Sequence, residues 1–265
     1  MKIEIENTSS PGASFTDNTN EVLLKIYDWI KKHKNDVLSF KSFRIALQQE
    51  KGINDNNSRN IYPLLKNCGL VQYENRGNLV VKDFFTNTGF AYVKTLETKC
   101  LLKDSVQYSE IQKLKAIQKL DDITSKIIRD ALSQLLKNKE LNYIDPLKGF
   151  ISYLLAFEKI NKTEFAYYLY AKKIETNENV FKSIEQNIYD YRSGNLQFDI
   201  QISVRNDIEL RQKTKSDKRK EGLSFLTSYT YFSSLLQQAG LVFKQNGYFV
   251  LKEEYRSDIE KLLEV

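Results

Sequence analysis

Two stretches far apart in the chain share one order of apolar and polar positions. Residues 61–85 read IYPLLKNCGLVQYENRGNLVVKDFF, and residues 232–255 read FSSLLQQAGLVFKQNGYFVLKEEY. In both, a Leu-Leu pair, a Gly and a Leu-Val pair precede a polar tip that ends in a second Gly, and an alternating apolar run follows. A helix that ends at a Gly with positive φ and leads into two strands joined by a tight turn would produce this order. The pattern therefore predicts a helix followed by a β-hairpin twice, with hairpins over 70–82 and 241–252.

The residues before the first copy of this pattern predict two further helices. Apolar residues recur at helical spacing in the first of them, and Ser39 can cap the second, which ends near Gly52. Asn54 or Asp55 can cap the third helix, whose apolar face continues into the first copy. Three helices followed by a hairpin make up a winged helix, and with one more helix after the hairpin we expect this domain over 20–102.

The middle of the chain is predicted to be helical. No Gly or Pro occurs from residue 104 to residue 145, and an apolar stripe runs along this segment without strict heptad spacing, which favours packing within the chain over a long coiled coil. The stripe consists of Ile111, Leu114, Ile117, Leu120, Ile123, Ile127, Ala131, Leu132 and Leu135. Three more helices are predicted beyond this stripe. The first spans 146–159, the second begins at a Thr163 cap, and the third lies near 179–192. Together they resemble a helix-turn-helix core without a wing.

These elements predict a mainly α fold with small β-hairpins. Tandem winged-helix and helix-turn-helix subdomains would be joined by helical segments. We expect four parts: a polar N-terminal arm over 1–19, a first winged helix over 20–102, a helical linker with a middle helix-turn-helix-like domain over 103–204, and a second winged helix over 205–265.

The charge balance is compatible with a polyanionic partner but does not require one. The chain has 40 Lys and Arg against 34 Asp and Glu, which gives a net charge of +6. Its two cysteines and single histidine are too few for a Cys/His zinc site or a disulfide framework, so we expect no metal and no cofactor. Two isolated cysteines suit a reducing compartment, so we expect a cytoplasmic protein. We expect no membrane partner, because no apolar run approaches the ~18 residues of a membrane span.

The start of the third helix is the first candidate DNA-binding segment. Asn and Arg pair with the edges of adenine and guanine in the major groove, and helix-turn-helix proteins place such residues at the start of the recognition helix. The candidates are Asn54, Asn56, Asn57, Ser58, Arg59 and Asn60. The alternative is that these residues form an ordinary polar loop and helix cap.

The equivalent helix of the second copy and the two hairpin turns supply further candidates. Ser228, Tyr229 and Thr230 offer hydroxyl groups for phosphates or bases. Arg76 in the first turn, with Lys244 and Asn246 in the second, suits phosphate or minor-groove contact. An ordinary half-buried helix and ordinary turns would explain the same residues.

The most basic segment precedes the second winged helix. We expect its side chains to contact phosphates of any sequence, although most charge runs are only solvated surfaces. The candidates are Arg211, Lys213, Lys215, Lys218, Arg219 and Lys220.

Three residues raise the alternative of a nuclease. Asp83, Glu97 and Lys99 have the spacing of an acid followed by Glu-x-Lys, which one large group of metal-dependent nucleases uses to bind Mg²⁺ and activate water. The catalytic core of that group needs strands around these residues, whereas here a helix is predicted for Glu97 and Lys99. The sequence therefore favours a chain that is not itself an enzyme and leaves these three as weak catalytic candidates.

The order of parts resembles the DNA-recognition half of modular, type IIS-like restriction endonucleases and nickases. The resemblance is carried by LLKNCGLVQYENRGNLVV, INKTEFAYYLYA and YFSSLLQQAGLVFKQNGYFVL. It implies sequence-specific binding of double-stranded DNA within restriction-modification, with cleavage by a separate or fused nuclease domain. Two alternatives remain: a Mg²⁺-dependent DNA nuclease in its own right, and a winged-helix protein-interaction module or transcriptional regulator. The last predicts an exposed apolar patch in place of a continuous basic face.

Overall fold

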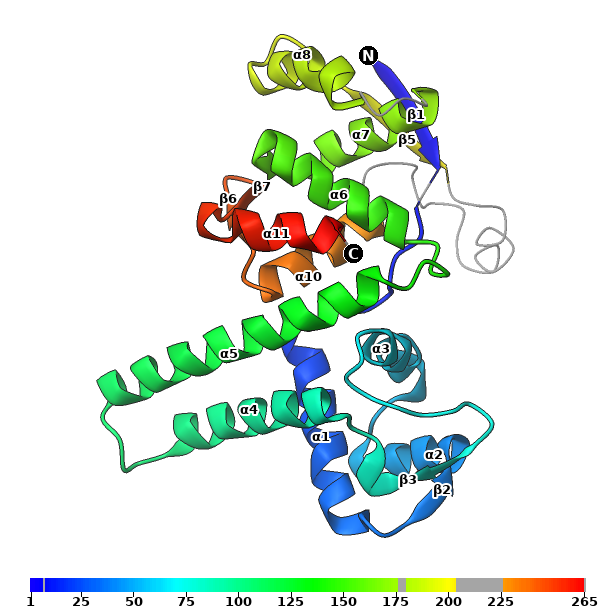
Figure 1. Ribbon diagram of the computed structural model, residues 1–265, viewed down its shortest axis with the longest axis vertical. Helices are drawn as coiled ribbons and strands as arrows, with labels where there is room; N and C mark the ends of the chain where they lie inside the picture. Colours follow the sequence, from blue (N-terminus) through cyan, green and yellow to red (C-terminus); the bar gives the residue numbers. More distant parts are fainter. Residues whose placement is uncertain (7, 176–179, 204–225, 265) are drawn as a thin grey trace. The chain divides into compact units, whose positions relative to one another are not determined.

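The computed structural model describes residues 1–6, 8–175, 180–203 and 226–264. Among these residues the protein is mainly α-helical with three small β-sheets (Figure 1), which confirms the predicted balance of helix and strand. The chain divides into two compact units. The 11–138 unit consists of Pro11–Asn138 with Ser234–Gly240, and the 139–264 unit consists of Lys139–Ser233 and Leu241–Glu264 with Met1–Ser10.

The 11–138 unit begins with the three predicted helices. In chain order it contains α1 (Asp17–His33), β2 (Val37–Ser39), α2 (Phe40–Lys51), α3 (Asp55–Asn67), β3 (Asn78–Val80), a 3-10 turn (Val81–Asp83), α4 (Asn87–Asp104) and α5 (Glu110–Leu136). The Ser39 hydroxyl caps α2, and Gly52 ends it in the left-handed conformation with φ 64°. The fully buried rings of Trp29, Phe43 and Phe84 contact one another in sequence and fix the core beneath these helices.

The first predicted hairpin, over 70–82, is wrong in its pairing. Strand β3 pairs antiparallel with β2, so that Leu79 lies opposite Leu38. The chain just after α3 pairs further along instead, through a bridge between Val71 and Phe85. Strand β2 has three residues, which is too short for a period-two pattern to stand out, and the prediction therefore paired the two strands nearest in sequence.

The 139–264 unit contains the second hairpin, and this prediction is confirmed. Besides β1 (Lys2–Glu6), its described elements are α6 (Ile144–Phe157), β4 (Lys159–Ile160), α7 (Lys162–Ile174), α8 (Val180–Arg192), β5 (Asp199–Ser203), the first part of α10 (Thr227–Gln238), β6 (Val242–Gln245), β7 (Tyr248–Leu251), a 3-10 turn (Glu253–Tyr255) and α11 (Arg256–Leu263). The end of α10, from Ser234 on, belongs to the 11–138 unit. Strands β6 and β7 pair antiparallel around a two-residue turn, in which Asn246 and Gly247 have φ 48° and 81°. Strand β7 also pairs with β4, which gives the sheet order β4-β7-β6.

The predicted N-terminal arm is replaced by a strand. Strand β1 (Lys2–Glu6) pairs parallel with β5, and its Ile3 and Ile5 side chains are buried. The alternation of charged and apolar residues in KIEIE is that of a half-buried strand, but its partner lies so far along the chain that the pattern alone could not place it. Helix α7 also differs in detail, since Asn161 caps it where Thr163 was expected.

The compact units do not follow the four predicted segments. Residues from the expected middle domain over 103–204 and from the expected second winged helix over 205–265 lie together in the 139–264 unit. In the part of the chain that is described, no helix combines the length and apolar character that a membrane crossing requires.

Candidate nucleic-acid interface

The two small sheets β2-β3 and β4-β7-β6 share one feature of chain order: the strand between two helices pairs with a strand that follows a later helix. In the 11–138 unit, β2 lies between α1 and α2 and pairs with β3, which follows α3. In the 139–264 unit, β4 lies between α6 and α7 and pairs with β7, which follows α10. Helix α8 and strand β5 lie between α7 and α10 in the chain. Helices α3 and α10 therefore occupy similar positions in the chain, since each precedes the strand that pairs back to β2 or to β4.

The start of α3 is organised by one carboxylate and two arginines. Arg44 of α2 donates from Nε to Asp55 Oδ1 at 2.7 Å, and its Nη2 contacts the same oxygen. This hydrogen bond is the main reason that the pKa of Asp55 lies below its ordinary value. Arg59 lies 3.5 Å from the other oxygen, one helical turn on, with a side chain that is 65% exposed. An exposed pair of this spacing contributes about 0.3–0.5 kcal/mol, so Arg59 can leave Asp55 for another anion at little cost.

Of the predicted reading residues, Arg59 and Asn60 lie exposed on α3, and Asn54 lies exposed just before it. Asn60 packs beside Gly12, where an added side chain would come within 3.0 Å of its amide carbon. Ser58 is a correction, because it is buried and its hydroxyl donates to Asp55 O at 3.0 Å. The side chains of Asn56 and Asn57 lie outside the described residues.

Helical spacing could have separated these roles. Ser58 precedes the buried residues Ile61 and Tyr62 by three and four positions, which places it on the inward side of the helix. Lys66, two turns after Arg59, was not predicted but is exposed. We call Arg59, Asn60, Pro63 and Lys66 the outer face of α3, since all four are exposed.

The loop that carries Arg76 is anchored on the helices. Lys66 donates to Tyr73 O at 2.9 Å, and the Tyr73 ring stacks on Phe40 of α2 at 3.9 Å between centroids. Arg76 itself is exposed in the turn before β3. Arg76 thus lies in a turn, as predicted. The segments on its two sides do not pair with each other, because β3 pairs with β2 and Val71 bridges to Phe85.

At the start of α10, two of the three predicted residues belong to the core. Ser228 is fully buried, and its hydroxyl shares a hydrogen bond with Thr8. Tyr229 is 8% exposed, donates to Ile160 O at 3.4 Å, and has a pKa raised by burial. Neither can contact DNA while α10 stays packed, which corrects both assignments. Thr230 is exposed.

The second hairpin presents its predicted residues outward. Lys244 and Asn246 are exposed at and next to the turn between β6 and β7. The predicted phosphate-binding residues Arg211, Lys213, Lys215, Lys218, Arg219 and Lys220 lie outside the described residues.

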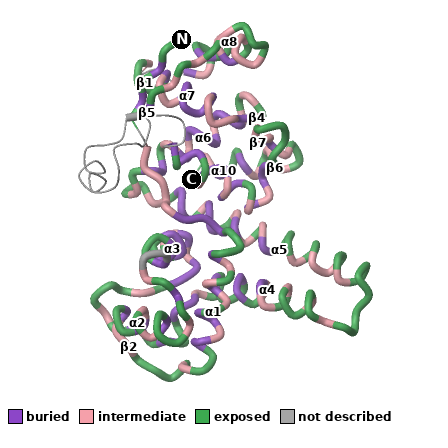
Figure 2. Tube along the Cα trace, turned by 180° about the vertical axis from the view of Figure 1, so that it is seen from behind, coloured by how far each residue is buried: buried purple, intermediate pink, exposed green. Residues whose placement is uncertain are grey.

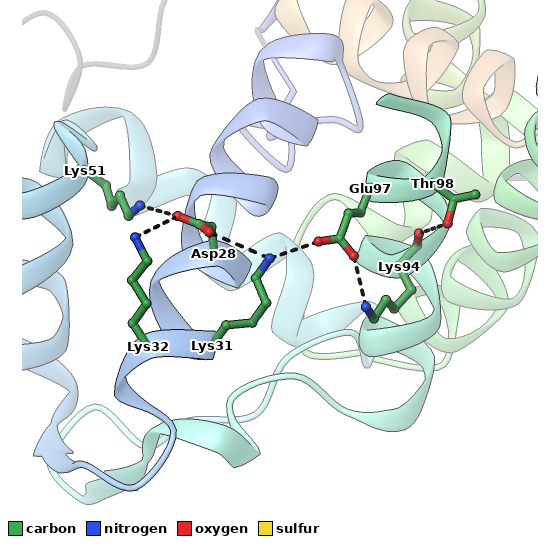
Figure 3. Close-up of polar contacts among 7 residues, drawn as sticks. All are labelled: Asp28, Lys31, Lys32, Lys51, Lys94, Glu97 and Thr98. Carbon is green, nitrogen blue, oxygen red and sulfur yellow. Dashed lines mark hydrogen bonds and ion pairs between the residues drawn. The ribbon is translucent and has the colours of Figure 1, made fainter. Parts of the chain in front are cut away.

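The nuclease candidates are held by other partners. Glu97 of α4 accepts from Lys31 and Lys94, at 2.9 Å each, and these two hydrogen bonds lower the pKa of its carboxyl (Figure 3). Lys99 pairs with Asp121 of α5. Residues two apart on a helix point about 200° apart, so Glu97 and Lys99 cannot converge as they would on a strand.

Asp83 does not complete a metal site with them. It is exposed at the end of a 3-10 turn, and its backbone carbonyl accepts from the Gln72 amide at 2.8 Å. Across residues 1–6, 8–175, 180–203 and 226–264, no group of three or more His, Cys, Asp or Glu side chains is arranged to hold a metal ion. Figure 3 shows a network of ion pairs that joins α1 to Lys51 at the end of α2 and to Glu97 of α4.

One buried ion pair was not predicted from the sequence. Glu164 of α7 is fully buried, and Arg192 of α8 donates to both of its oxygens, at 2.7 and 3.1 Å. Arg192 also donates to the backbone carbonyl of Lys159 in β4, at 2.8 Å. Through these hydrogen bonds Arg192 connects α8 to both helix α7 and strand β4. A charged residue three positions after the Asn161 cap was the only signal in the sequence, and a capping box accounts for it.

No protein-family model, curated protein or solved structure matches this chain. Any functional assignment therefore depends on the arrangement of its helices and strands and on the side chains that they expose.

Proposed function

We propose that the chain binds duplex DNA in a sequence-specific manner through two winged helices, one in each compact unit. The repeated order of elements carries this proposal. In a winged helix the strand between the first two helices pairs with the last strand of the wing, and β2 with β3 and β4 with β7 follow that rule. On this interpretation α3 and α10 are the two third helices, the element that enters the major groove in helix-turn-helix proteins.

Base reading is assigned to the outer face of α3. Arg59 can pair with guanine through two donors, and Asn60 can pair with adenine through a donor and an acceptor. Lys66 farther along the helix and Arg76 in the anchored loop suit phosphate contacts on either side. The weak ion pair between Arg59 and Asp55 supports this role, because Arg59 would lose only that pair when it binds a base edge.

The 139–264 unit is assigned to contacts with the DNA backbone. Ser228 and Tyr229 of its third helix are buried, whereas Thr230 and the hairpin residues Lys244 and Asn246 are exposed. Hydroxyl, amide and ammonium groups of this kind bind phosphate oxygens without reading sequence. The basic run from Arg211 to Lys220 precedes α10 in the chain and would add to the same contacts, in line with the net charge of +6.

The resemblance to restriction enzymes extends the proposal to target recognition. In that role this chain would select the site in the cytoplasm, and a separate or fused nuclease domain would cut. The ion pairs that Glu97 forms with Lys31 and Lys94 favour a binding role for this chain over Mg²⁺-dependent nuclease activity.

Fluorescence anisotropy with random duplexes, followed by selection from a randomised duplex library, tests the proposal. We expect binding that falls steeply with salt concentration and a selected consensus that binds more tightly than random DNA. A protein with Arg59→Ala serves as the control, and it should select a weaker consensus or none. Absence of duplex binding at low salt would overturn the proposal.

A further inference from the structure

The outer halves of α4 and α5 form a helical hairpin that lacks a core. We call residues 97–123 the outer helical hairpin, and none of them is buried (Figure 2). The buried residues of α4 all precede this segment, and those of α5 all begin at Thr124. The stripe predicted to pack within the chain therefore does so only over its second half. Helices in proteins gain most of their stability from a packed apolar face, and here that face is open.

The open face is most apolar at the tip. Leu101, Val106, Tyr108, Ile111 and Leu114, which we call the tip patch, are 66%, 97%, 49%, 67% and 66% exposed. They lie at the end of α4, in the connection and in the first turns of α5, so they are neighbours in the chain and along the helices. Their exposed area is on the order of several hundred Å², comparable to the largest apolar patch of an ordinary monomer.

The charges around the tip patch argue against a polyanion as its partner. The outer helical hairpin contains five lysines and five carboxylates, so it is neutral in a chain of net charge +6. Lysines and carboxylates are interleaved along it, and several pair within the hairpin, as Lys99 does with Asp121 and Lys113 with Glu110. A neutral surface with both signs can face a copy of itself without net repulsion, which is the condition for an isologous contact.

We propose that the tip patch is the contact between two copies of this chain, related by a two-fold axis through the outer helical hairpins. Several hundred Å² per copy lies below the roughly 800 Å² per partner of a standard interface, which is the size of a weak, concentration-dependent contact. Each copy covers the apolar residues that the other leaves exposed. This inference concerns the chain without DNA and does not depend on the proposed function.

Sedimentation velocity on the whole chain, from about 1 to about 100 μM protein, tests the contact. We expect the wild type to form dimers as its concentration rises. The double substitution Ile111→Ala and Leu114→Ala removes apolar area but keeps good helix formers, and it should raise the dissociation constant about tenfold or more. The matched control is Ile45→Ala with Ile174→Ala, two exposed isoleucines on α2 and α7 that should leave the dissociation constant unchanged.

A second measurement locates the contact within the dimer. Cys100 is exposed in the outer helical hairpin and Cys68 is buried, so a nitroxide label attaches selectively at Cys100. Dipolar spectroscopy should then show a short, narrow distance between labels that the Ile111→Ala and Leu114→Ala protein loses. A wild type that stays monomeric at every concentration would overturn the proposal. So would a dimer that persists unchanged in the double variant, or one whose labels are too far apart to couple.

Discussion

In both units a strand between two helices pairs with a strand that follows a later helix, yet the starts of those later helices, α3 and α10, differ. In α3 the first turns expose Arg59 and Asn60, while Ser58 turns inward. In α10 Ser228 and Tyr229 are buried, because Thr8 and the backbone of Ile160 hold their hydroxyl groups. Equivalent positions in one arrangement therefore do not imply equivalent chemistry. What decides the role of a helix start is whether other parts of the unit cover it.

The largest expected effect compares the buried ion pair of the 139–264 unit, Glu164 with Arg192, with the more exposed pair of the 11–138 unit, Asp55 with Arg44. Glu164→Ala leaves Arg192 without its buried partner, which should lower the free energy of unfolding by about 3–5 kcal/mol. Asp55→Ala, which breaks the half-exposed pair with Arg44, should cost less than about 1 kcal/mol. Chemical denaturation followed by circular dichroism measures both.

A compensated variant tests the cause of that loss. Glu164→Leu with Arg192→Met replaces the pair by apolar side chains, and it should recover much of the stability. Fluorescence of Trp29, the single tryptophan, reports on the 11–138 unit, and its transition should move less than the circular dichroism signal in Glu164→Ala. A cost below about 1 kcal/mol for Glu164→Ala would show that the pair is not the main support of the 139–264 unit.

The next effect separates the two third helices as readers of DNA. Arg59→Ala should weaken binding to the selected site by about 1–3 kcal/mol and binding to random duplex by much less. Thr230→Ala on α10 should change both affinities slightly and equally, since its hydroxyl contacts only the DNA backbone. Anisotropy titrations on the selected and a scrambled duplex measure the difference. Specificity lost in Thr230→Ala and kept in Arg59→Ala would reverse the assignment of the two helices.

A smaller effect is expected for the basic segment before α10. Lys218→Ala with Lys220→Ala should weaken binding to the selected and the scrambled duplex about equally, because lysines bind phosphates of any sequence. The slope of the logarithm of affinity against the logarithm of salt concentration should fall by about one for each phosphate that the variant no longer neutralises. If only the selected duplex were affected, this segment would contain the reader.

The smallest effect is a pH dependence at the start of α3. Arg44 holds the pKa of Asp55 below that of a carboxyl in the unfolded chain, so their pair stabilises the folded state above about pH 4. This contribution is lost as the pH falls through the folded-state pKa. Thermal melts between pH 6 and pH 3 should show a loss that Asp55→Asn lacks. An identical pH profile for the variant would mean that the pair adds nothing to stability.

The sequence predicted the elements whose partners are close in the chain. The hairpin of β6 and β7 was recognised because both strands and their Asn-Gly turn are contiguous. Strands β1 and β2 were missed, because each is short and pairs with a strand far along the chain. A pattern within a few residues cannot specify a partner that only the folded core brings near.

The candidate site shows the same limit at the level of single residues. Hydroxyl and amide side chains at a helix start serve equally as caps, as buried hydrogen-bond groups and as ligands for bases. Helical spacing could have assigned Ser58 to the inward side. It could not have shown that Thr8, which lies 220 residues earlier in the chain, shares a hydrogen bond with the hydroxyl of Ser228.

The parallel pairing of β1 with β5 has a consequence for synthesis of the protein. Strand β1 leaves the ribosome before β5, and at ordinary elongation rates its partner follows about 10–40 s later. Residues 11–138 are made in that interval and can begin to fold while β1 remains unpaired with Ile3 and Ile5 exposed. Such non-local pairing slows folding. The nascent chain therefore carries an open, apolar strand edge near its N-terminus until the 139–264 unit closes over it, and this is the stage at which aggregation or chaperone binding is expected.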